Sequence, residues 1–351
     1  MNRILCFLFT AMLCAAVDEP ISKTNANLQK ILKRYPAADA NKDGILTLPG
    51  AKAFQKLRRE REANRPQIKP TNADIAYGTH ARHKLDLWLT ERDGPTPLLI
   101  CIHGGGFRAG DKSSYHRQVN LIKRMHAAGI SVAAINYRYT EGGKNPLPGA
   151  MHDAARAVQY LRHNARRFNL DKTHFAATGG SAGACILMWR GFHDDLADPD
   201  NADPVKREST RLIALAPSGG QPTISPATFR EWFDVKNLTP HPAMRAIFGL
   251  RGEGAIEWTS ELTELARISS PITYLTRDDP PCYQTYGSAD TSVTEKTKPN
   301  EWVHHPRLGI KLKEAMDQLG IECHVQYKNG PPIPVYRGVN DFLVKKLTGN
   351  R

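Results

Sequence analysis

Residues 174–188 read HFAATGGSAGACILM: an apolar run, a group of small residues around Ser181, and a second apolar run. The first run has the composition of a buried strand, and the second that of a helix. A serine between them stands on a sharp strand-to-helix turn, where its hydroxyl is exposed and small neighbours relieve crowding. The N-terminal end of the helix, with the backbone N–H of Ala182, points toward the same place. The pattern predicts a nucleophilic serine beside a site that stabilises negative charge.

A glycine-rich stretch earlier in the chain supports this prediction. The strand-like run Leu98–Ile102 is followed directly by His103, Gly104, Gly105 and Gly106. Glycines after a buried strand let the backbone approach a substrate closely, so the N–H groups of Gly105 and Gly106 are expected to form an oxyanion hole with Ala182. We expect His103 and Gly104 to shape this loop, and His103 is not the expected base.

From residue 74 onward, strand-like runs alternate with helix-like runs, which is typical of an α/β fold with a mostly parallel sheet and helices on both faces. The expected strands are 75–77, 85–89, 98–102, 131–136, 174–178, 212–216, 282–286 and 322–327. The expected helices are 118–128, 151–168, 182–191, 307–319 and 339–347. Residues 221–270 do not follow this alternation and contain aromatic residues among prolines and glycines. This composition favours a cap inserted over a pocket. The alternative is a surface segment with its own small core.

Four stretches together resemble the α/β-hydrolase superfamily, and within it the hormone-sensitive-lipase-like and bacterial feruloyl/acetyl esterase (BD-FAE-like) families. They are HGGGFRAGDK (103–112), INYRY (135–139), MHDAARAVQYLRHNA (151–165) and GGSAG (179–183). The resemblance covers residues 75–347 and places the hydrolase domain within 74–351. It implies that Ser181 is the nucleophile and that an acid follows the penultimate strand. That acid is Asp290 by position, whereas Asp278 and Asp279 precede the strand and should lie at its opposite end.

The histidine of the triad departs from the family pattern, since it normally follows the last strand and no histidine occurs after His324. His324 lies within the expected strand and is expected to be a packed or edge residue. The nearest substitutes are His304 and His305, after Asp290 and just before a helix, with His305 slightly favoured as the general base. The alternative is that both only cap and pack the start of that helix.

The N-terminus reads as an export signal. Arg3 precedes the apolar stretch ILCFLFTAMLCAA, which is shorter than the about 20 residues that a spanning helix needs, and small residues follow near Ala16. We therefore expect residues 1–16 to be a signal peptide and the protein to be secreted or periplasmic, with no integral membrane segment after signal removal. Removing this segment takes away one basic residue and no acid, so the net charge of +13 becomes +12.

Four cysteines remain after signal removal: Cys101, Cys185, Cys282 and Cys323. Their apolar surroundings favour buried thiols, and a Cys282–Cys323 bridge requires the two strands to be neighbours. The basic residues are spread along the chain rather than clustered, so a solvated basic surface is favoured over nucleic-acid binding.

A separate helix–loop–helix is expected at residues 27–65. In its loop, Asp39, Asn41, Asp43 and Gly44 match positions one, three, five and six of an EF-hand calcium loop. Position twelve, normally a bidentate Glu, is Gly50. The loop is therefore either a weak calcium site or an EF-hand-like turn that only keeps the shape.

The sequence as a whole favours an exported serine esterase that acts on carboxylic esters through an acyl-enzyme on Ser181, with no cofactor required. The expected substrate is a small-molecule or polysaccharide ester, and acetyl or feruloyl esters of polysaccharides are the candidates considered. The alternative is a catalytically weakened, hydrolase-like binding protein that has lost its base. A peptidase of the same fold is less favoured, because the HGGG loop resembles esterases.

Overall fold

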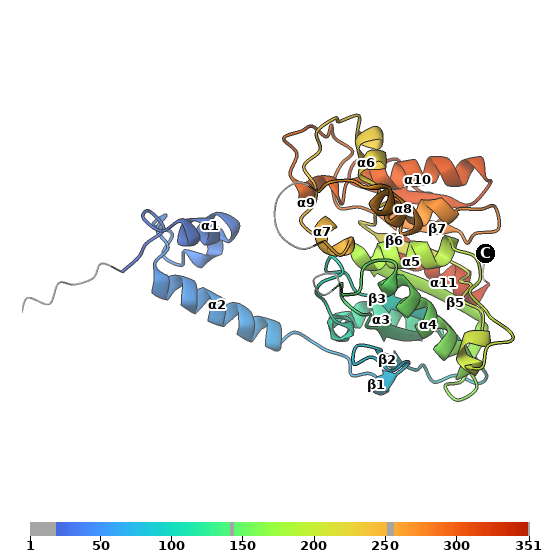
Figure 1. Ribbon diagram of the computed structural model, residues 1–351. Coiled ribbons are helices and arrows are strands. Elements are labelled where there is room, and N and C mark those ends of the chain that lie inside the picture. The colour runs from blue at the N-terminus through green and yellow to red at the C-terminus, as the bar shows by residue number, and fades with distance from the viewer. Residues whose placement is uncertain (1–18, 141–143, 251–255, 350–351) are drawn as a thin grey trace, which may run out of the picture. The chain divides into compact units, whose positions relative to one another are not determined.

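The computed structural model describes residues 19–140, 144–250 and 256–349, in two compact units that divide between Pro66 and Gln67 (Figure 1). The proposed signal peptide, residues 1–16, lies outside the described residues. Within the described residues, no helix is both long enough and apolar enough to cross a bilayer.

The larger unit is built on one eight-stranded sheet in the order β1-β2-β4-β3-β5-β6-β7-β8. The strands are β1 (Asn72–Ala76), β2 (Lys84–Trp88), β3 (Thr96–Ile102), β4 (Ser131–Ile135), β5 (Leu170–Gly180), β6 (Leu215–Ser218), β7 (Cys282–Thr285) and β8 (Cys323–Gln326). β2 is antiparallel to β1 and β4, and all other neighbours are parallel. The predicted mostly parallel α/β sheet is confirmed. β5 begins earlier than expected because Leu170 already pairs with Thr96.

Helices cover both faces of this sheet, as the ribbon shows (Figure 1). Along β3, Leu98, Ile100 and Ile102 pack into the core shared with α4, α5 and α10, whereas Leu99 and Cys101 pack into the core shared with α3 and α11. This alternation is the period-two pattern of a strand buried on both faces. The helices are α3 (Val119–Ala127), α4 (Gly149–His163), α5 (Ala182–Phe192), α10 (Pro306–Gln318) and α11 (Val339–Thr348).

In its described part, the segment predicted to form a cap contains three short helices, α6 (Pro226–Phe233), α7 (Met244–Ile247) and α8 (Ser260–Ile268). A further short helix, α9 (Pro299–Trp302), immediately precedes α10. Trp302 is buried against Phe229 and Phe233 of α6, with ring centroids 5.0 and 6.2 Å apart. This aromatic cluster fixes α9 against the first helix of the 221–270 segment.

The four cysteines are free and buried. Cys282 and Cys323 lie opposite one another on the neighbouring strands β7 and β8, as a bridge between them requires. Both are nevertheless free thiols in the structure. Burial raises the pKa of the Cys282 thiol, which disfavours the reactive thiolate.

The smaller unit contains α1 (Ala26–Arg34) and α2 (Leu48–Ala63). The Asn25 side chain caps α1 and the Thr47 hydroxyl caps α2, each accepting from backbone N–H groups of the first turn. Leu28, Leu46 and Ala51 form its buried core.

Candidate active site

Ser181 occupies the turn between β5 and α5, as the sequence predicted. Its backbone has φ 53° and ψ −119°, a conformation that L-residues rarely adopt and that costs about 1–3 kcal/mol. The Ser181 N–H donates to the Ser218 carbonyl of the next strand at 2.8 Å. The strained turn is therefore held by the sheet, and the side chain projects at the carboxyl edge, where open parallel sheets bind ligands.

Gly183, two residues after the serine, shows why small residues flank this turn. A Cβ atom there would lie 2.2 Å from the Ile102 carbonyl oxygen and 2.7 Å from the His103 carbonyl oxygen. No side chain fits that gap without moving the backbone. The close approach brings the first turn of α5 against the glycine-rich loop that follows β3.

The three backbone N–H groups predicted to hold an oxyanion are free. Those of Gly105, Gly106 and Ala182 donate no hydrogen bond to any residue that the structure describes. The Gly105 carbonyl accepts from the N–H groups of Arg108 and Ala109, both at 3.1 Å, which holds the loop in a tight turn. All three residues line the same cavity as Ser181, so their N–H groups are placed to stabilise the charge that develops on a carbonyl oxygen when its carbon is attacked there.

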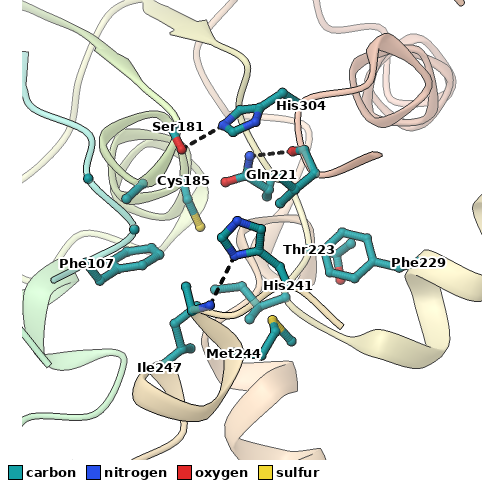
Figure 2. Close-up of a pocket in the computed structure, with 16 residues that line it drawn as sticks. Phe107, Ser181, Cys185, Gln221, Thr223, Phe229, His241, Met244, Ile247 and His304 are labelled. Carbon is teal, nitrogen blue, oxygen red and sulfur yellow. Dashed lines mark hydrogen bonds between the residues drawn. The ribbon is translucent and has the colours of Figure 1, made fainter. Parts of the chain in front are cut away.

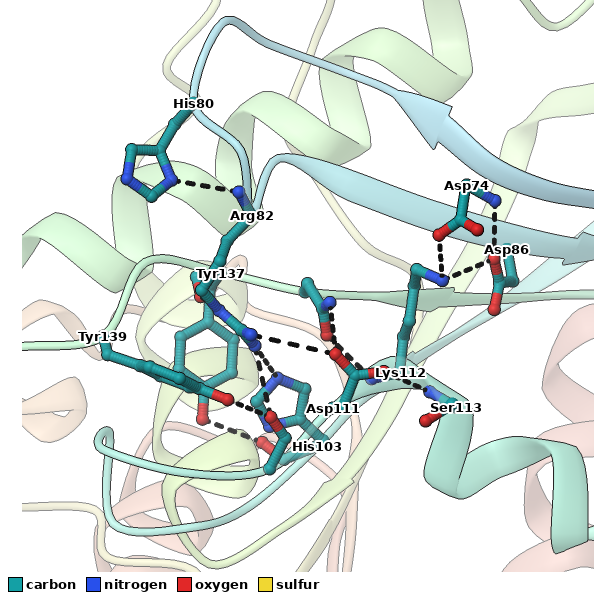
Figure 3. Close-up of polar contacts among 12 residues, drawn as sticks. Asp74, His80, Arg82, Asp86, His103, Asp111, Lys112, Ser113, Tyr137 and Tyr139 are labelled. Carbon is teal, nitrogen blue, oxygen red and sulfur yellow. Dashed lines mark hydrogen bonds and ion pairs between the residues drawn. The ribbon is translucent and has the colours of Figure 1, made fainter.

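A polar network behind this loop involves His103 (Figure 3). Its Nδ1–H donates to the Gly104 carbonyl at 2.8 Å, which leaves Nε2 to accept from the Arg82 guanidinium at 3.3 Å. Burial lowers the pKa of His103, so the neutral ring is favoured. The ring also stacks on Tyr137, with centroids 4.4 Å apart. His103 therefore contacts the loop and not the cavity, in keeping with a loop-shaping role.

Arg82 connects that network to two further segments. Its Nε donates to the Tyr137 carbonyl at 2.8 Å, and its Nη2 donates to the Gly110 carbonyl at 3.2 Å. The guanidinium carbon lies 3.7 Å from the centroid of the Tyr139 ring, a cation–π contact. Arg82 thus joins both ends of the glycine-rich loop to the chain after β4.

His304 is the histidine that meets Ser181 (Figure 2). Its Nε2 lies 2.9 Å from Ser181 Oγ, and its Nδ1 lies 3.2 Å from the backbone carbonyl of Asn300. A carbonyl only accepts, so Nδ1 carries the proton and Nε2 is the free acceptor for the serine hydroxyl. Gly219 borders the ring, since a Cβ there would lie 3.1 Å from His304 Cδ2.

His305, which the sequence slightly favoured as the base, is placed elsewhere. Its Nδ1 accepts from the Arg307 N–H at 3.2 Å as the N-cap of α10, and its ring packs edge-on against Phe233 at 5.6 Å. The residue is buried, and burial lowers the pKa of its imidazole. The structure brings His304, and not the favoured His305, to Ser181, because the start of α10 turns His305 into the interior.

Asp290, the expected triad acid, does not contact His304. Its carboxylate accepts two hydrogen bonds from the Arg307 guanidinium, at 3.1 and 3.0 Å, and lies 3.8 Å from His305 Nδ1. The position after β7 is as expected, but a nearer arginine engages the carboxylate. His324 pairs with Glu322 at 3.0 Å on β8, in keeping with a packed or edge residue.

A cavity of about 210 Å³ opens beside Ser181 and His304. Its apolar lining includes Phe107, Cys185, Ile224, Phe229, Met244 and Ile247, and its polar lining includes Gln221, Thr223 and His241. Seven of these residues belong to the 221–247 part of the segment predicted to be a cap. The cavity is therefore shaped by both the sheet edge and that segment.

His241, which sequence reasoning missed, is connected to His304 through Asn300. Its Nδ1 accepts from the Ala243 N–H at 3.2 Å, so Nε2 carries the proton and donates to Asn300 Oδ1 at 2.9 Å. Burial lowers the pKa of His241. No sequence pattern marks Asn300, because its contribution to His304 is a backbone carbonyl.

The calcium-loop residues of the smaller unit keep the geometry of a turn. Asp39 Oδ2 accepts from the Gly44 N–H at 2.8 Å, and Asp43 Oδ1 accepts from the Ile45 N–H at 2.7 Å. Asn41 Nδ2 donates to Asp43 Oδ2 at 2.8 Å. Asp39 Oδ1 is buried without a hydrogen-bond partner. Two carboxylates and one amide fall short of the six to eight oxygens that calcium takes, and Gly50 adds no side chain at position twelve, so these side chains alone do not complete a site.

Curated proteins similar to this chain include several esterases. A probable carboxylic ester hydrolase of Mycobacterium tuberculosis, LipM, is 25% identical over 291 residues, which are 81% of this chain and 60% of that protein. Esterase LipQ of the same organism is 26% identical over 225 residues, covering 63% of this chain and 49% of LipQ. Versiconal hemiacetal acetate esterase of Dothistroma septosporum is 27% identical over 161 residues, covering 45% of this chain and 46% of that protein. The chain thus spans about half of these relatives' length.

Solved structures share the fold. An acetyl ester-xyloside bifunctional hydrolase from Caldicellulosiruptor lactoaceticus superposes with a TM-score of 0.53 at 21% identity, over 77% of this chain and 83% of that one. The propionate-bound esterase Est2 of Thermogutta terrifontis gives 0.52 at 20% identity, over 79% and 92%. These neighbours identify the architecture as the α/β-hydrolase fold, as the sequence predicted.

The family model BD-FAE matches residues 85–300, more than half of the chain. The match contains the glycine-rich loop, the serine turn and Asp290, and it ends before His304. With the sheet order, the strained serine and the free N–H groups in place, the chain belongs to the BD-FAE family of α/β-hydrolase proteins.

Proposed function

We propose that this protein is a serine esterase that hydrolyses carboxylic esters, with Ser181 as nucleophile and His304 as general base. The observation that carries the proposal is the 2.9 Å contact between His304 Nε2 and Ser181 Oγ, beside three unpaired backbone N–H groups. A serine hydroxyl at its ordinary pKa is a poor nucleophile, and an adjacent imidazole is what activates it. The esterase names of the similar curated proteins support the same class of reaction.

In the first half of the reaction, Ser181 Oγ attacks the ester carbonyl carbon while His304 Nε2 takes the hydroxyl proton. The carbonyl oxygen becomes an oxyanion facing the N–H groups of Gly105, Gly106 and Ala182. Collapse breaks the bond to the alcohol oxygen, which receives the proton from His304 and leaves. The acyl group then remains on Ser181.

In the second half, His304 takes a proton from water, and the hydroxide attacks the acyl carbon. The same oxyanion site holds the intermediate, and the Ser181 oxygen leaves with the proton that His304 returns. The products are a carboxylic acid, an alcohol and the free serine, so no cofactor is needed.

The Asn300 carbonyl replaces the carboxylate that usually orients the base. It fixes the Nδ1–H tautomer, yet it carries only a partial charge and stabilises an imidazolium less than a carboxylate does. Among the described residues, no carboxylate hydrogen-bonds His304. This observation favours a second candidate, a hydrolase-like binding protein with weak turnover.

Short acyl groups suit the cavity, since about 210 Å³ is less than the roughly 300–1,000 Å³ of drug-sized pockets. Acetyl esters of polysaccharides are therefore preferred over feruloyl esters as the natural substrates. The name of the acetyl ester-xyloside hydrolase that shares this fold is consistent with that choice. The N-terminal apolar segment supports export, so a polymer or oligomer outside the cytoplasm is the proposed setting.

The test is turnover of p-nitrophenyl acetate and butyrate by the wild type, Ser181→Ala, His304→Ala and His305→Ala, with folding checked by circular dichroism. We expect loss of turnover by about 10²–10⁴-fold in Ser181→Ala and His304→Ala but not in His305→Ala. A fluorophosphonate should label the wild type and not Ser181→Ala. Wild-type rates equal to those of Ser181→Ala, with no labelling, would support the binding-protein alternative.

A further inference from the structure

One buried side chain in the cavity directs an unsatisfied acceptor into it. Gln221 follows β6 after two glycines and is 8% exposed. Its Nε2 donates to the Gly219 carbonyl at 2.7 Å and to the Val303 carbonyl at 2.6 Å. Both amide hydrogens are therefore engaged by backbone acceptors.

These two bonds fix which way the amide faces. If the amide were flipped, Oε1 would lie against two carbonyl oxygens and all three groups would only accept. Oε1 must therefore face the other side, toward Ser181 and Cys185, as Figure 2 shows. There it accepts no hydrogen bond from the described residues.

The other polar side chains of the cavity are already paired. The Thr223 hydroxyl accepts from the Ser225 N–H at 3.1 Å and contacts Ser270 Oγ at 3.3 Å. Both ring nitrogens of His241 are engaged, by Ala243 and Asn300. Gln221 Oε1 is accessible from the cavity. A bound molecule that covers it has to supply a donor, because an acceptor enclosed without a partner costs free energy.

The position of Gln221 indicates which part of an ester it meets. Its amide is bound to Val303, the residue before His304. His304 returns its proton to the departing alcohol, so the alcohol half of the ester lies on the His304 side of the cavity. Gln221 therefore lies on the His304 side of the cavity, and its Oε1, on the side of the amide turned away from Val303, is open to a leaving group bound there.

We propose that Gln221 is a specificity-determining residue that accepts a hydrogen bond from a free hydroxyl on the alcohol half of the substrate. The substrate class is then an incompletely acylated polyol or sugar, with an unmodified hydroxyl next to the scissile ester. This inference rests on the proposed esterase function. A site built to pair with a hydroxyl discriminates strongly against an analogue that lacks the donor, because the protein group is left unpaired.

The experiment compares kcat/KM for 2-hydroxyethyl acetate and 2-methoxyethyl acetate. The two leaving groups carry an oxygen at the same place, but only the first can donate. We expect the wild type to favour the hydroxy ester by about tenfold or more. Gln221→Met, which keeps the side-chain length and removes the acceptor, should bring the ratio close to one. Thr223→Val is the matched control, a polar-to-apolar change in the same cavity, and should keep the wild-type ratio.

Each variant is compared with itself on two substrates, so a general loss of activity cancels from the ratio. A wild-type ratio near one, or a Gln221→Met variant that keeps the full preference, would overturn the inference while leaving the esterase intact. A donor requirement on the acyl side, seen as ethyl 3-hydroxybutyrate favoured over ethyl butyrate in the wild type only, would overturn the assignment to the alcohol half. No turnover of any ester and no labelling of Ser181 would instead refute the esterase function and this inference with it.

Discussion

His304 and Ser181 lie 123 residues apart in the chain, and their side chains meet at 2.9 Å. The histidine comes from the short connection between α9 and α10, not from the loop after the last strand, β8. Its second nitrogen finds the backbone carbonyl of Asn300 four residues earlier. The His304 ring is thus oriented by its own local chain, without a carboxylate from a second loop.

This arrangement predicts that the Asn300 side chain is largely dispensable. Asn300→Ala removes the amide that His241 contacts but keeps the backbone carbonyl that orients His304. We expect kcat/KM for p-nitrophenyl acetate to fall by less than about fivefold, whereas His304→Ala loses about 10²–10⁴-fold. A loss in Asn300→Ala as large as that in His304→Ala would show that the amide itself acts in the reaction.

The strained backbone conformation of Ser181 predicts a trade-off between stability and activity. Its φ of 53° suits glycine, so Ser181→Gly should relieve the turn, raise the free energy of unfolding by about 1 kcal/mol and abolish turnover. Ser181→Ala keeps a Cβ and should be inactive without the gain. Chemical denaturation of the three proteins measures the difference, and a glycine variant no more stable than the alanine variant would contradict stored strain at this turn.

The fold and half of the site could be predicted from sequence because they depend on local order. A strand, small residues and a helix in succession are enough to place Ser181, and the glycines after β3 place the N–H groups of Gly105 and Gly106. The choice between His304 and His305 depends on where α10 begins, since adjacent residues at a helix start point in different directions. The sequence does not fix that start within one residue.

The remaining site residues could not be predicted because their roles depend on tertiary neighbours. Asp290 follows β7 as expected, but Arg307, in the first turn of α10, binds its carboxylate instead. Gln221 and His241 come from a segment without periodic pattern. Their importance is visible only when the backbone carbonyls and the cavity are in place.

The network behind the glycine-rich loop predicts an effect on kcat. Arg82→Lys keeps the charge but cannot donate at once to His103, Tyr137 and Gly110 as the planar guanidinium does. The loop should then hold the N–H groups of Gly105 and Gly106 less firmly. Weakening an interaction that is made only in the transition state lowers kcat and leaves KM nearly unchanged. We expect kcat to fall about tenfold with KM within about twofold. A change confined to KM would place the role of Arg82 in substrate binding.

One buried carboxylate lies at the opposite end of the strands from Ser181. Its burial predicts that the free energy of unfolding depends on pH. Asp279 lies just before β7, its side chain is enclosed, and burial raises its pKa from 3.8 to about 6, although Arg211 lies 3.6 Å from Oδ1. Because the folded state holds the proton more tightly, the contribution of this group to stability is present at low pH and lost as the pH rises through about 6. At pH 8 the wild type therefore contains a buried, ionised carboxylate.

Asp279→Asn should remove that penalty, since the amide oxygen can still accept from the Thr276 N–H that Asp279 Oδ2 binds at 2.7 Å. We expect the stability advantage of the variant over the wild type to be about 1 kcal/mol larger at pH 8 than at pH 5, because the wild type loses the last part of this contribution between pH 5 and about 6. Thermal unfolding at the two pH values measures this. Asp278→Asn is the control, because that neighbouring carboxylate is solvated and its pKa is lowered, chiefly by the Thr276 hydroxyl. A larger advantage for Asp279→Asn at pH 5 than at pH 8 would reverse the sign and show that Arg211 stabilises the ionised form more than burial opposes it.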